Sequence, residues 1–336
     1  MAAFASQDSL YRACACLYKF RTPLCKNNGS VDFQASFVSS SGSDEAKALI
    51  MNLNISRKQM LVELASGSNS SSMRLSCLDI YLPLITNLLN SLNMQPPVAI
   101  EKQFSFEWRG AFCAPEQMAY NQSNEMIFEL GMVLHTKAVL HYNMAAEMLE
   151  GDVATNLQAA GQNLRIAAGI MRYLGTDLLP KWLAGAQGKG SRPPELCEEV
   201  CLAYAELFTA SAQQMAFVKA LVKVGGSPAG ILTKVGLGVV TLITGNYDPA
   251  RLLPDVKSHY SIMRELYKAL VSKYQAVTYS DKDEKGTAIG YCQEAAVSSC
   301  SCSCCPAVFL HRFTLRFLLY ARIIDKYCVV FDCLLL

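Results

Sequence analysis

The chain has 336 residues, of which 51% are hydrophobic and 17% are charged, and its formal net charge is +2. No cluster of Lys and Arg accompanies that small charge, so nucleic-acid binding has no electrostatic basis. The hydrophobic fraction is large enough for a sizeable core, and the low charged fraction favours long helices packed on more than one side.

The fourteen cysteines do not indicate a secreted, disulfide-bonded protein. The first residues, from Met1 to Asp8, lack the charged and then apolar pattern of a signal peptide. We therefore expect a reducing, cytoplasmic environment in which most cysteines act as small buried hydrophobic residues. No uncharged apolar run reaches about 18 residues, so we expect no membrane span.

The first third of the chain predicts a small strand region beside two helices. Residues 1–44 are weakly periodic, and the segments 29–33 and 39–43 are typical of strand and loop. Apolar spacing predicts helices over 44–64 and 73–92, and Pro96 and Pro97 end the second of them. Alternation of apolar and polar residues over 103–108 predicts a short strand.

From residue 116 onward the pattern is helical. Apolar residues recur three or four positions apart around 127–148 and again over 153–174. Pro180 and the Gly- and Pro-rich segment 185–194 predict a loop. A long helix is expected over 195–224, a break at 225–228 and a shorter helix over 229–244.

The clearest periodicity lies near the end of the helical part. Apolar and aromatic residues hold one helix face from Leu252 to Val277, and a short turn at 280–282 leads into Ala288, Tyr291 and Ala295. Two helices joined by so short a loop form an antiparallel hairpin, and large aromatics facing alanines are typical of tetratricopeptide-like pairs. The fold class expected is mainly α.

Four blocks of the chain, taken in order, resemble the BRO domain family. They are Phe104–Phe112, Asn124–Val133, Leu164–Leu174 and Ala212–Ala220, and the hairpin ending at Ala295 resembles the family's tetratricopeptide-like core. The resemblance covers residues 1–296 and is closest to the short, BROX-like members rather than to full-length ALIX. It implies a boomerang-shaped BRO domain with a small N-terminal strand region.

The resemblance also implies a partner and a groove. Members of the family bind the C-terminal amphipathic helix of ESCRT-III subunits, the charged multivesicular body proteins. The implied groove residues are Ile231, Leu232 and Val235, bordered by Phe217 and Leu221. Ile231 and Val235 are four positions apart and would share one helix face. Considered without the family, these two residues are more typical of a plain core.

Two positions depart from the family. The acidic and basic residues that the family carries one turn apart beside the groove fall on Ala154 and Gln158. Neither side chain forms a charged hydrogen bond, so we expect weaker polar orientation of a partner helix. This departure slightly favours an alternative, a tetratricopeptide-like scaffold for a different peptide.

The resemblance ends near Ala296, and residues 297–336 form a divergent Cys-, Phe- and Leu-rich tail that we interpret as an alternative splice end. On this interpretation the BRO domain is C-terminally incomplete, and a non-functional truncated isoform is a further alternative. Cys300, Cys302, Cys304 and Cys305 lie too close together to close a zinc tetrahedron easily, so we expect no metal.

The C-terminal residues from Cys333 to Leu336 match a prenylation box of the geranylgeranyl type. The alternative is a chance match in a Leu-rich tail. One prenyl chain anchors only weakly. Arg312, Arg316, Arg322 and Lys326 would assist at an anionic membrane.

No enzyme motif is present: the sequence has no phosphate-binding loop, no nucleophile elbow and no zinc-protease motif. We therefore predict a monomeric, cofactor-free adaptor rather than an enzyme, cytoplasmic and peripherally endosomal, with ESCRT-III helices as its partners.

Overall fold

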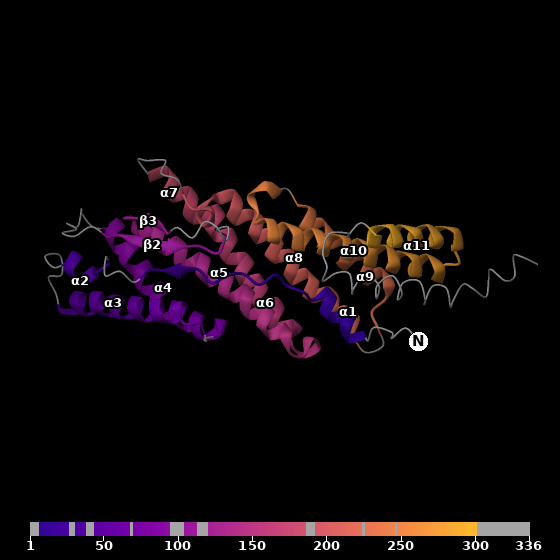
Figure 1. Cartoon of the computed structure of the whole chain (residues 1–336), viewed down its shortest axis with the longest axis horizontal. Coiled ribbons are helices and arrows are strands. Elements are labelled where there is room, and N and C mark those ends of the chain that lie inside the picture. The colour runs from indigo at the N-terminus through magenta and orange to yellow at the C-terminus, as the bar shows by residue number, and fades with distance from the viewer. Residues whose placement is uncertain are drawn as a thin grey trace, which may run out of the picture.

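The computed structural model describes most of the chain, and the helices form one elongated array (Figure 1). Helices α3 and α4 lie at one end of it and the α10–α11 hairpin at the other. The described residues are 7–26, 31–37, 44–67, 70–94, 104–112, 120–185, 192–223, 226–245 and 247–300.

The N-terminal arm combines a small sheet with two long helices. Its elements are β1 (Leu24–Cys25), α2 (Phe33–Ser36), α3 (Asp44–Ala65), α4 (Ser71–Met94), β2 (Phe106–Arg109) and β3 (Asn121–Ser123), whereas α1 (Gln7–Cys14) packs against α6, α8 and α10. The strands form an antiparallel sheet in the order β1-β2-β3, with Leu24 opposite Arg109 and Trp108 opposite Asn121. The predicted helices over 44–64 and 73–92 and the strand near 103–108 are confirmed.

Part of the expectation for residues 1–44 is wrong. Residues 31–33 form no strand; α2 starts at Phe33 because the Asp32 carboxylate accepts hydrogen bonds from the backbone N–H groups of Gln34 and Ala35, at 3.0 and 3.2 Å. This satisfies donors that a helix start leaves open. Helix α1 was also not foreseen, and the segment 39–43 lies outside the described residues.

The middle of the array consists of α5 (Met126–Glu150), α6 (Val153–Tyr173) and α8 (Glu198–Val222). A π-helical turn, Leu174–Leu178, joins α6 to α7 (Leu179–Gly185), and a 3-10 turn, Pro194–Leu196, precedes α8. The loop predicted at Pro180 is wrong. Pro180 lies in α7, two residues after the π-helical turn, in a helical run that continues without a break from α6.

The last third is helical too. It consists of α9 (Ala229–Thr244), a 3-10 turn (Pro249–Arg251), α10 (Pro254–Asp281) and α11 (Lys285–Cys300). The predicted hairpin is confirmed: α10 and α11 pack together, and the rings of Tyr279 and Tyr291 stack with centroids 5.4 Å apart. The mainly α fold class is therefore confirmed.

One buried carboxylate ties the N-terminal arm to α5. Glu129 is fully buried and accepts hydrogen bonds from Arg57 Nε at 2.9 Å, Tyr81 Oη at 3.2 Å and Trp108 Nε1 at 2.5 Å. These donors come from α3, α4 and β2. Burial, followed by the charge of Glu129, raises the pKa of Tyr81 well above its usual value, so the phenol remains a donor.

Arg57 completes this cluster. Its Nη2 lies 3.3 Å from Cys25 Sγ in β1, and its guanidinium lies 5.6 Å from the centroid of the Phe106 ring. Burial alone would lower the pKa of Arg57, but the charge of Glu129 raises it above its usual value. Arg57 is therefore charged in a buried site, where its ion pair with Glu129 depends on complete hydrogen bonding.

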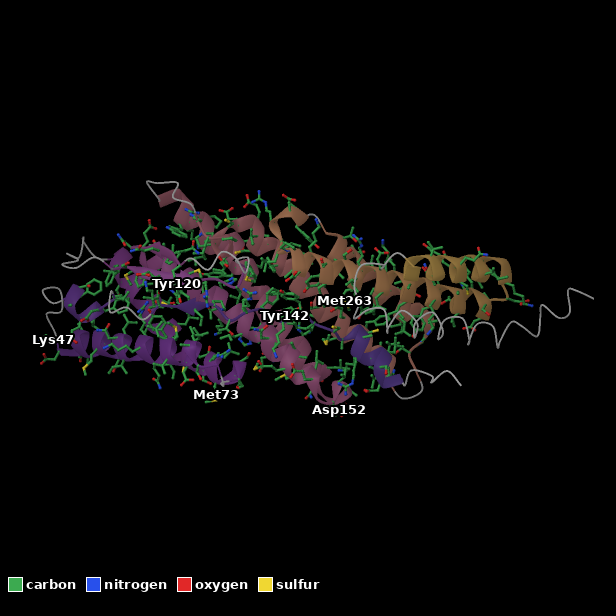
Figure 2. The ribbon with its side chains drawn as sticks, viewed as in Figure 1. Lys47, Met73, Tyr120, Tyr142, Asp152 and Met263 are labelled. Carbon is green, nitrogen blue, oxygen red and sulfur yellow. The ribbon has the colours of Figure 1, made fainter. Side chains whose placement is uncertain are left out.

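A second polar cluster joins α5 to the C-terminal half. Tyr142 Oη lies 3.3 Å from Ser211 Oγ of α8 and 3.1 Å from Tyr260 Oη of α10. Tyr267 Oη, two turns along α10, donates to the backbone oxygen of Cys14 at 2.9 Å. Figure 2 shows Tyr142 in the middle of the array. Helix α5 thus contacts the N-terminal arm and the C-terminal half through buried polar groups.

Helix α4 is the one described helix that is long and apolar enough to span a membrane. Its segment Ser71–Leu92 has a mean hydropathy of 1.2. By itself this is weak evidence for a span, since core helices have the same composition. Leu78, Tyr81 and Ile85 of α4 are fully buried in the core.

Replacing Glu129 by Gln should destabilise the fold strongly. The substitution leaves the Arg57 guanidinium buried without a counter-charge, and we expect a loss of about 3–5 kcal/mol in the free energy of unfolding. Urea unfolding followed by circular dichroism measures it. Glu150→Gln, which removes the exposed ion pair with Lys19, is the control and should cost less than about 1 kcal/mol. A loss of similar size in both variants would show that the buried pair does not hold the arm.

Histidine burial should make the fold acid-sensitive. Burial lowers the pKa of His135 to about 3, and neither ring nitrogen has a hydrogen-bond partner among the described residues. The unfolded state, with a pKa near 6.5, binds the proton more tightly, so stability falls as pH drops from about 6.5 to about 3.

His135→Leu should remove this dependence. The variant should gain stability relative to the parent by up to about 1.4 kcal/mol for each pH unit below 6.5. Unfolding free energies at pH 7.0, 5.5 and 4.5 measure the difference, and a constant difference across that range would contradict a neutral buried His135.

Candidate partner-binding face

Helix α8 lies between α6 and α9, and one glycine of each neighbour faces it. A Cβ added at Gly161 of α6 would lie 3.5 Å from Met215 Cβ, and one added at Gly238 of α9 would lie 3.2 Å from Gln213 Nε2. Contacts of α8 with both helices are extensive. We call the outward surface of these three helices the α6–α8–α9 face.

Polar pairs mark the two ends of the seam between α6 and α8. Lys219 Nζ donates to Gln158 Oε1 at 3.4 Å at one end. Arg172 Nη2 forms an ion pair with Glu206 Oε1 at 3.1 Å at the other. Between the pairs, Ala216 of α8 is exposed on one side of the seam, and Gln162 and Arg165 of α6 are exposed on the other.

Helix α9 presents an apolar stripe beside α8. Ile231, Val235, Gly238 and Leu242 are spaced by four, three and four residues and therefore share one helix face. Gly238 touches Gln213 of α8, so the stripe is turned toward α8. Ile231 is 49% exposed, whereas Val235 and Leu242 are half-buried. An exposed isoleucine in line with half-buried apolar neighbours is suited to contact with another apolar helix.

The structure separates the five predicted groove residues into two layers. Ile231, Val235 and Leu221 lie at the surface, with Ile231 the most exposed. Phe217 is fully buried, with its ring 5.1 Å from that of Tyr267, and Leu232 is only 4% exposed. These two therefore lie beneath the face, because they fall on the inward sides of α8 and α9, and they support the stripe rather than line it.

Ala154 and Gln158 are both exposed on α6. Lys219, which the sequence pattern did not single out, is exposed on α8 and donates a hydrogen bond to Gln158. A signal was present, since Lys219 is the one charged residue in the stretch 207–222. Lys223 and Lys234 are also exposed near this end of the face, and with Lys219 they outnumber the exposed carboxylate of Asp152 beside Ala154.

The sequence of the chain matches the BRO1-like domain family over residues 28–310. The chain belongs to this family. No curated protein sequence matches the chain.

Solved structures of BRO1-like domains share the fold. A complex of the ALIX BRO1 domain with CHMP4C superposes with a TM-score of 0.72 at 14% identity, covering 93% of this chain and 88% of that one. ALIX in complex with a late domain of SIVmac239 gives 0.74 at 15%, covering 94% and 46%. A structure described as the basis for endosomal targeting by the Bro1 domain gives 0.68 at 15%, covering 94% and 87%.

The predictions about metal binding and about the C-terminal tail concern residues outside the α6–α8–α9 face. Among the described residues, no three of His, Cys, Asp or Glu come together in a way that would hold a metal ion. Cys302, Cys304, Cys305 and Cys333 lie outside the described residues, so the interpretations of the tail stay predictions.

Two neighbouring residues of α9 should differ in how much their substitution destabilises the fold. Leu232→Ala removes a buried side chain and should cost about 2–5 kcal/mol in unfolding free energy. Ile231→Ser changes an exposed side chain and should cost less than about 0.5 kcal/mol. Thermal and urea unfolding of both variants measure this. A large loss for Ile231→Ser would make Ile231 a core residue and remove it from the face.

Proposed function

We propose that this BRO1-like chain is an adaptor whose α6–α8–α9 face binds the amphipathic helix of an ESCRT-III subunit. The observation that carries the proposal is the stripe of Ile231 and Val235. It occupies the position that the family resemblance implies, and Ile231 is exposed although it is strongly apolar. The fold neighbour that supports this partner is the ALIX BRO1 domain bound to CHMP4C.

The physical basis is a helix docked on its apolar side. A partner helix would place residues at positions i, i+3 or i+4 and i+7 against Ile231, Val235 and the exposed Ala216. Burying the exposed half of Ile231 contributes on the order of 1 kcal/mol. The small side chain at position 216 lets the partner backbone approach α8 closely.

Lys219 supplies the charge that Ala154 and Gln158 lack. Its weak hydrogen bond to Gln158, at 3.4 Å, is between exposed groups, so a carboxylate on a partner helix can replace it. Lys223 and Lys234 add positive charge at the same end. A partner with acidic residues near that end of its helix would therefore be favoured.

The same proposal implies where in the cell the chain acts and that it binds a partner rather than catalysing a reaction. An ESCRT-III adaptor acts at endosomes from the cytoplasm, and the fold neighbour described for endosomal targeting supports this. Binding rather than catalysis is the activity proposed. Prenylation at Cys333 would add a weak membrane anchor, and this part rests on the sequence of the tail alone.

Ile231→Asp in the full chain should reduce binding to a peptide of the CHMP4C C-terminal helix by at least about tenfold, because a carboxylate would be desolvated at the centre of the contact. Fluorescence anisotropy with a labelled peptide measures the dissociation constant. Ile289→Asp, the same change at a similarly exposed position of α11, is the matched control and should leave binding unchanged.

Equal binding by the Ile231→Asp and parent chains would contradict the assignment of the face. If the folded parent chain does not bind this peptide, the proposed ESCRT-III partner is wrong. The alternative of a different peptide partner, which Ala154 and Gln158 favour, would then be tested with other helical peptides.

A further inference from the structure

Exposed large hydrophobic side chains concentrate at the end of the array opposite the hairpin. Of the fifteen such residues in the described part of the chain, six lie on α3 and α4. They are Leu49, Met51, Ile55, Val62, Met73 and Ile80. Single exposed apolar residues are normal, but a contiguous group marks an interaction surface.

The exposed residues of α3 follow a seven-residue repeat. Ala48, Ile55 and Val62 are seven apart, and Met51 and Ala65 each come three residues after one of them. All five are exposed. Leu53, Met60, Leu61 and Leu64 fill the opposite side of the helix and are buried. Helix α3 therefore has two apolar sides, and the outer one has the spacing of a coiled-coil seam.

Helix α4 extends this surface sideways. Burial and then the charge of Glu63 raise the pKa of the Cys77 thiol, so Glu63 of α3 and Cys77 of α4 lie near each other. Met73 and Ile80 lie one turn before and one turn after Cys77, alongside the C-terminal half of α3. Figure 2 shows Met73 at the outer margin of the pair. We call Ala48, Met51, Ile55, Val62, Met73 and Ile80 the outer α3–α4 face.

The charge of Lys58 limits which partners can bind the outer α3–α4 face. It is exposed and occupies the seam position three residues after Ile55 and four before Val62. Among the described residues, no carboxylate lies within ion-pair distance of it, and Asp32, whose pKa its charge helps to lower, is engaged in capping α2. A lysine in an apolar seam selects the partner that can pair with it.

A second copy of the chain does not meet that condition. When two α3 seams overlap along their whole length, parallel or antiparallel, one Lys58 lies close to the other in a desolvated contact, which costs free energy. A membrane surface is also disfavoured, because Lys47 and Lys58 are the only cations on α3 outside the buried Arg57. Each lysine near an anionic surface contributes only about 1 kcal/mol.

We propose that the outer α3–α4 face is a second docking site, which binds an amphipathic helix with a heptad apolar seam and an acidic residue opposite Lys58. It lies at the other end of the array from α9, α10 and α11 (Figure 1), so it does not depend on the α6–α8–α9 face. The chain would thereby hold two helical partners at once.

The test uses a phage-displayed library of amphipathic helices with Leu, Ile or Val at the seam positions and random residues elsewhere. The bait is the full chain carrying Ile231→Asp, which disables the other face. Two further baits add Ile55→Ser or Lys58→Glu, and the matched control adds Ile289→Ser. All three added changes are at exposed positions, and equal thermal unfolding verifies that folding is retained.

We expect helices with Glu or Asp at one fixed seam-flanking position to be enriched, and Ile55→Ser to lower that enrichment at least tenfold. Ile289→Ser should not change it, and Lys58→Glu should reverse the preference to Lys or Arg. Equal enrichment on the Ile55→Ser bait, or no charge preference, would overturn the proposal. Two other results would also overturn it. If the chain dimerises in sedimentation and Ile55→Ser abolishes the dimer, a second copy covers this face. If the chain binds phosphatidylcholine–phosphatidylserine vesicles and Ile55→Ser abolishes that binding, a membrane covers it.

Discussion

The arrangement of the N-terminal arm depends on the carboxylate of Glu129. This buried charge has three donors, from α3, α4 and β2, and its ion-pair partner Arg57 also reaches β1. A buried charge is tolerated only when its hydrogen bonds are complete. Each of these elements is therefore held where its side chain can reach Glu129 or Arg57. The orientation of α3 follows from this, because the hydrogen bonds of Arg57 fix which side of the helix faces the core.

Helix α5 carries this constraint to the rest of the molecule. Glu129 and Tyr142 lie thirteen residues apart on it, which corresponds to about 20 Å. Tyr142 contacts Ser211 of α8 and Tyr260 of α10, which belong to the C-terminal half. Because α8 also forms the middle of the α6–α8–α9 face, that face and the outer α3–α4 face are positioned by opposite ends of one buried helix.

The sequence was enough to predict the long helices, because their apolar repeats extend over many turns. Helix α9 over 229–244 and the hairpin of α10 and α11 were predicted with nearly the observed bounds. Short elements were not: α1, α2 and β3 have too few residues for a period, and α2 depends on the cap at Asp32. Pro180 was misjudged because its effect depends on its position within the helix.

The candidate face was predicted only in part, for a reason specific to α9. The helix is apolar almost all round, so spacing alone cannot say which side is turned inward. Burial shows that Leu232 faces the core and Ile231 does not, although they are adjacent. The pair of Arg57 with Glu129 was missed because charged residues in a helix usually face water. Lys219 was missed because its contact with Gln158 joins distant segments and is not visible in a local pattern.

The two proposed faces share one electrostatic preference and differ in shape. Lys219, Lys223 and Lys234 border the α6–α8–α9 face, and Lys58 lies within the seam of α3, so both favour helices that carry carboxylates. The first face spans three helices with a small residue in its middle, whereas the second is a seam on one helix flanked by another. A partner with two amphipathic helices could occupy both, and its second contact would then form at the effective concentration set by the linker between them. Since α5 fixes the separation of the faces, that linker has a minimum length, and partners with shorter linkers would bind through one face only.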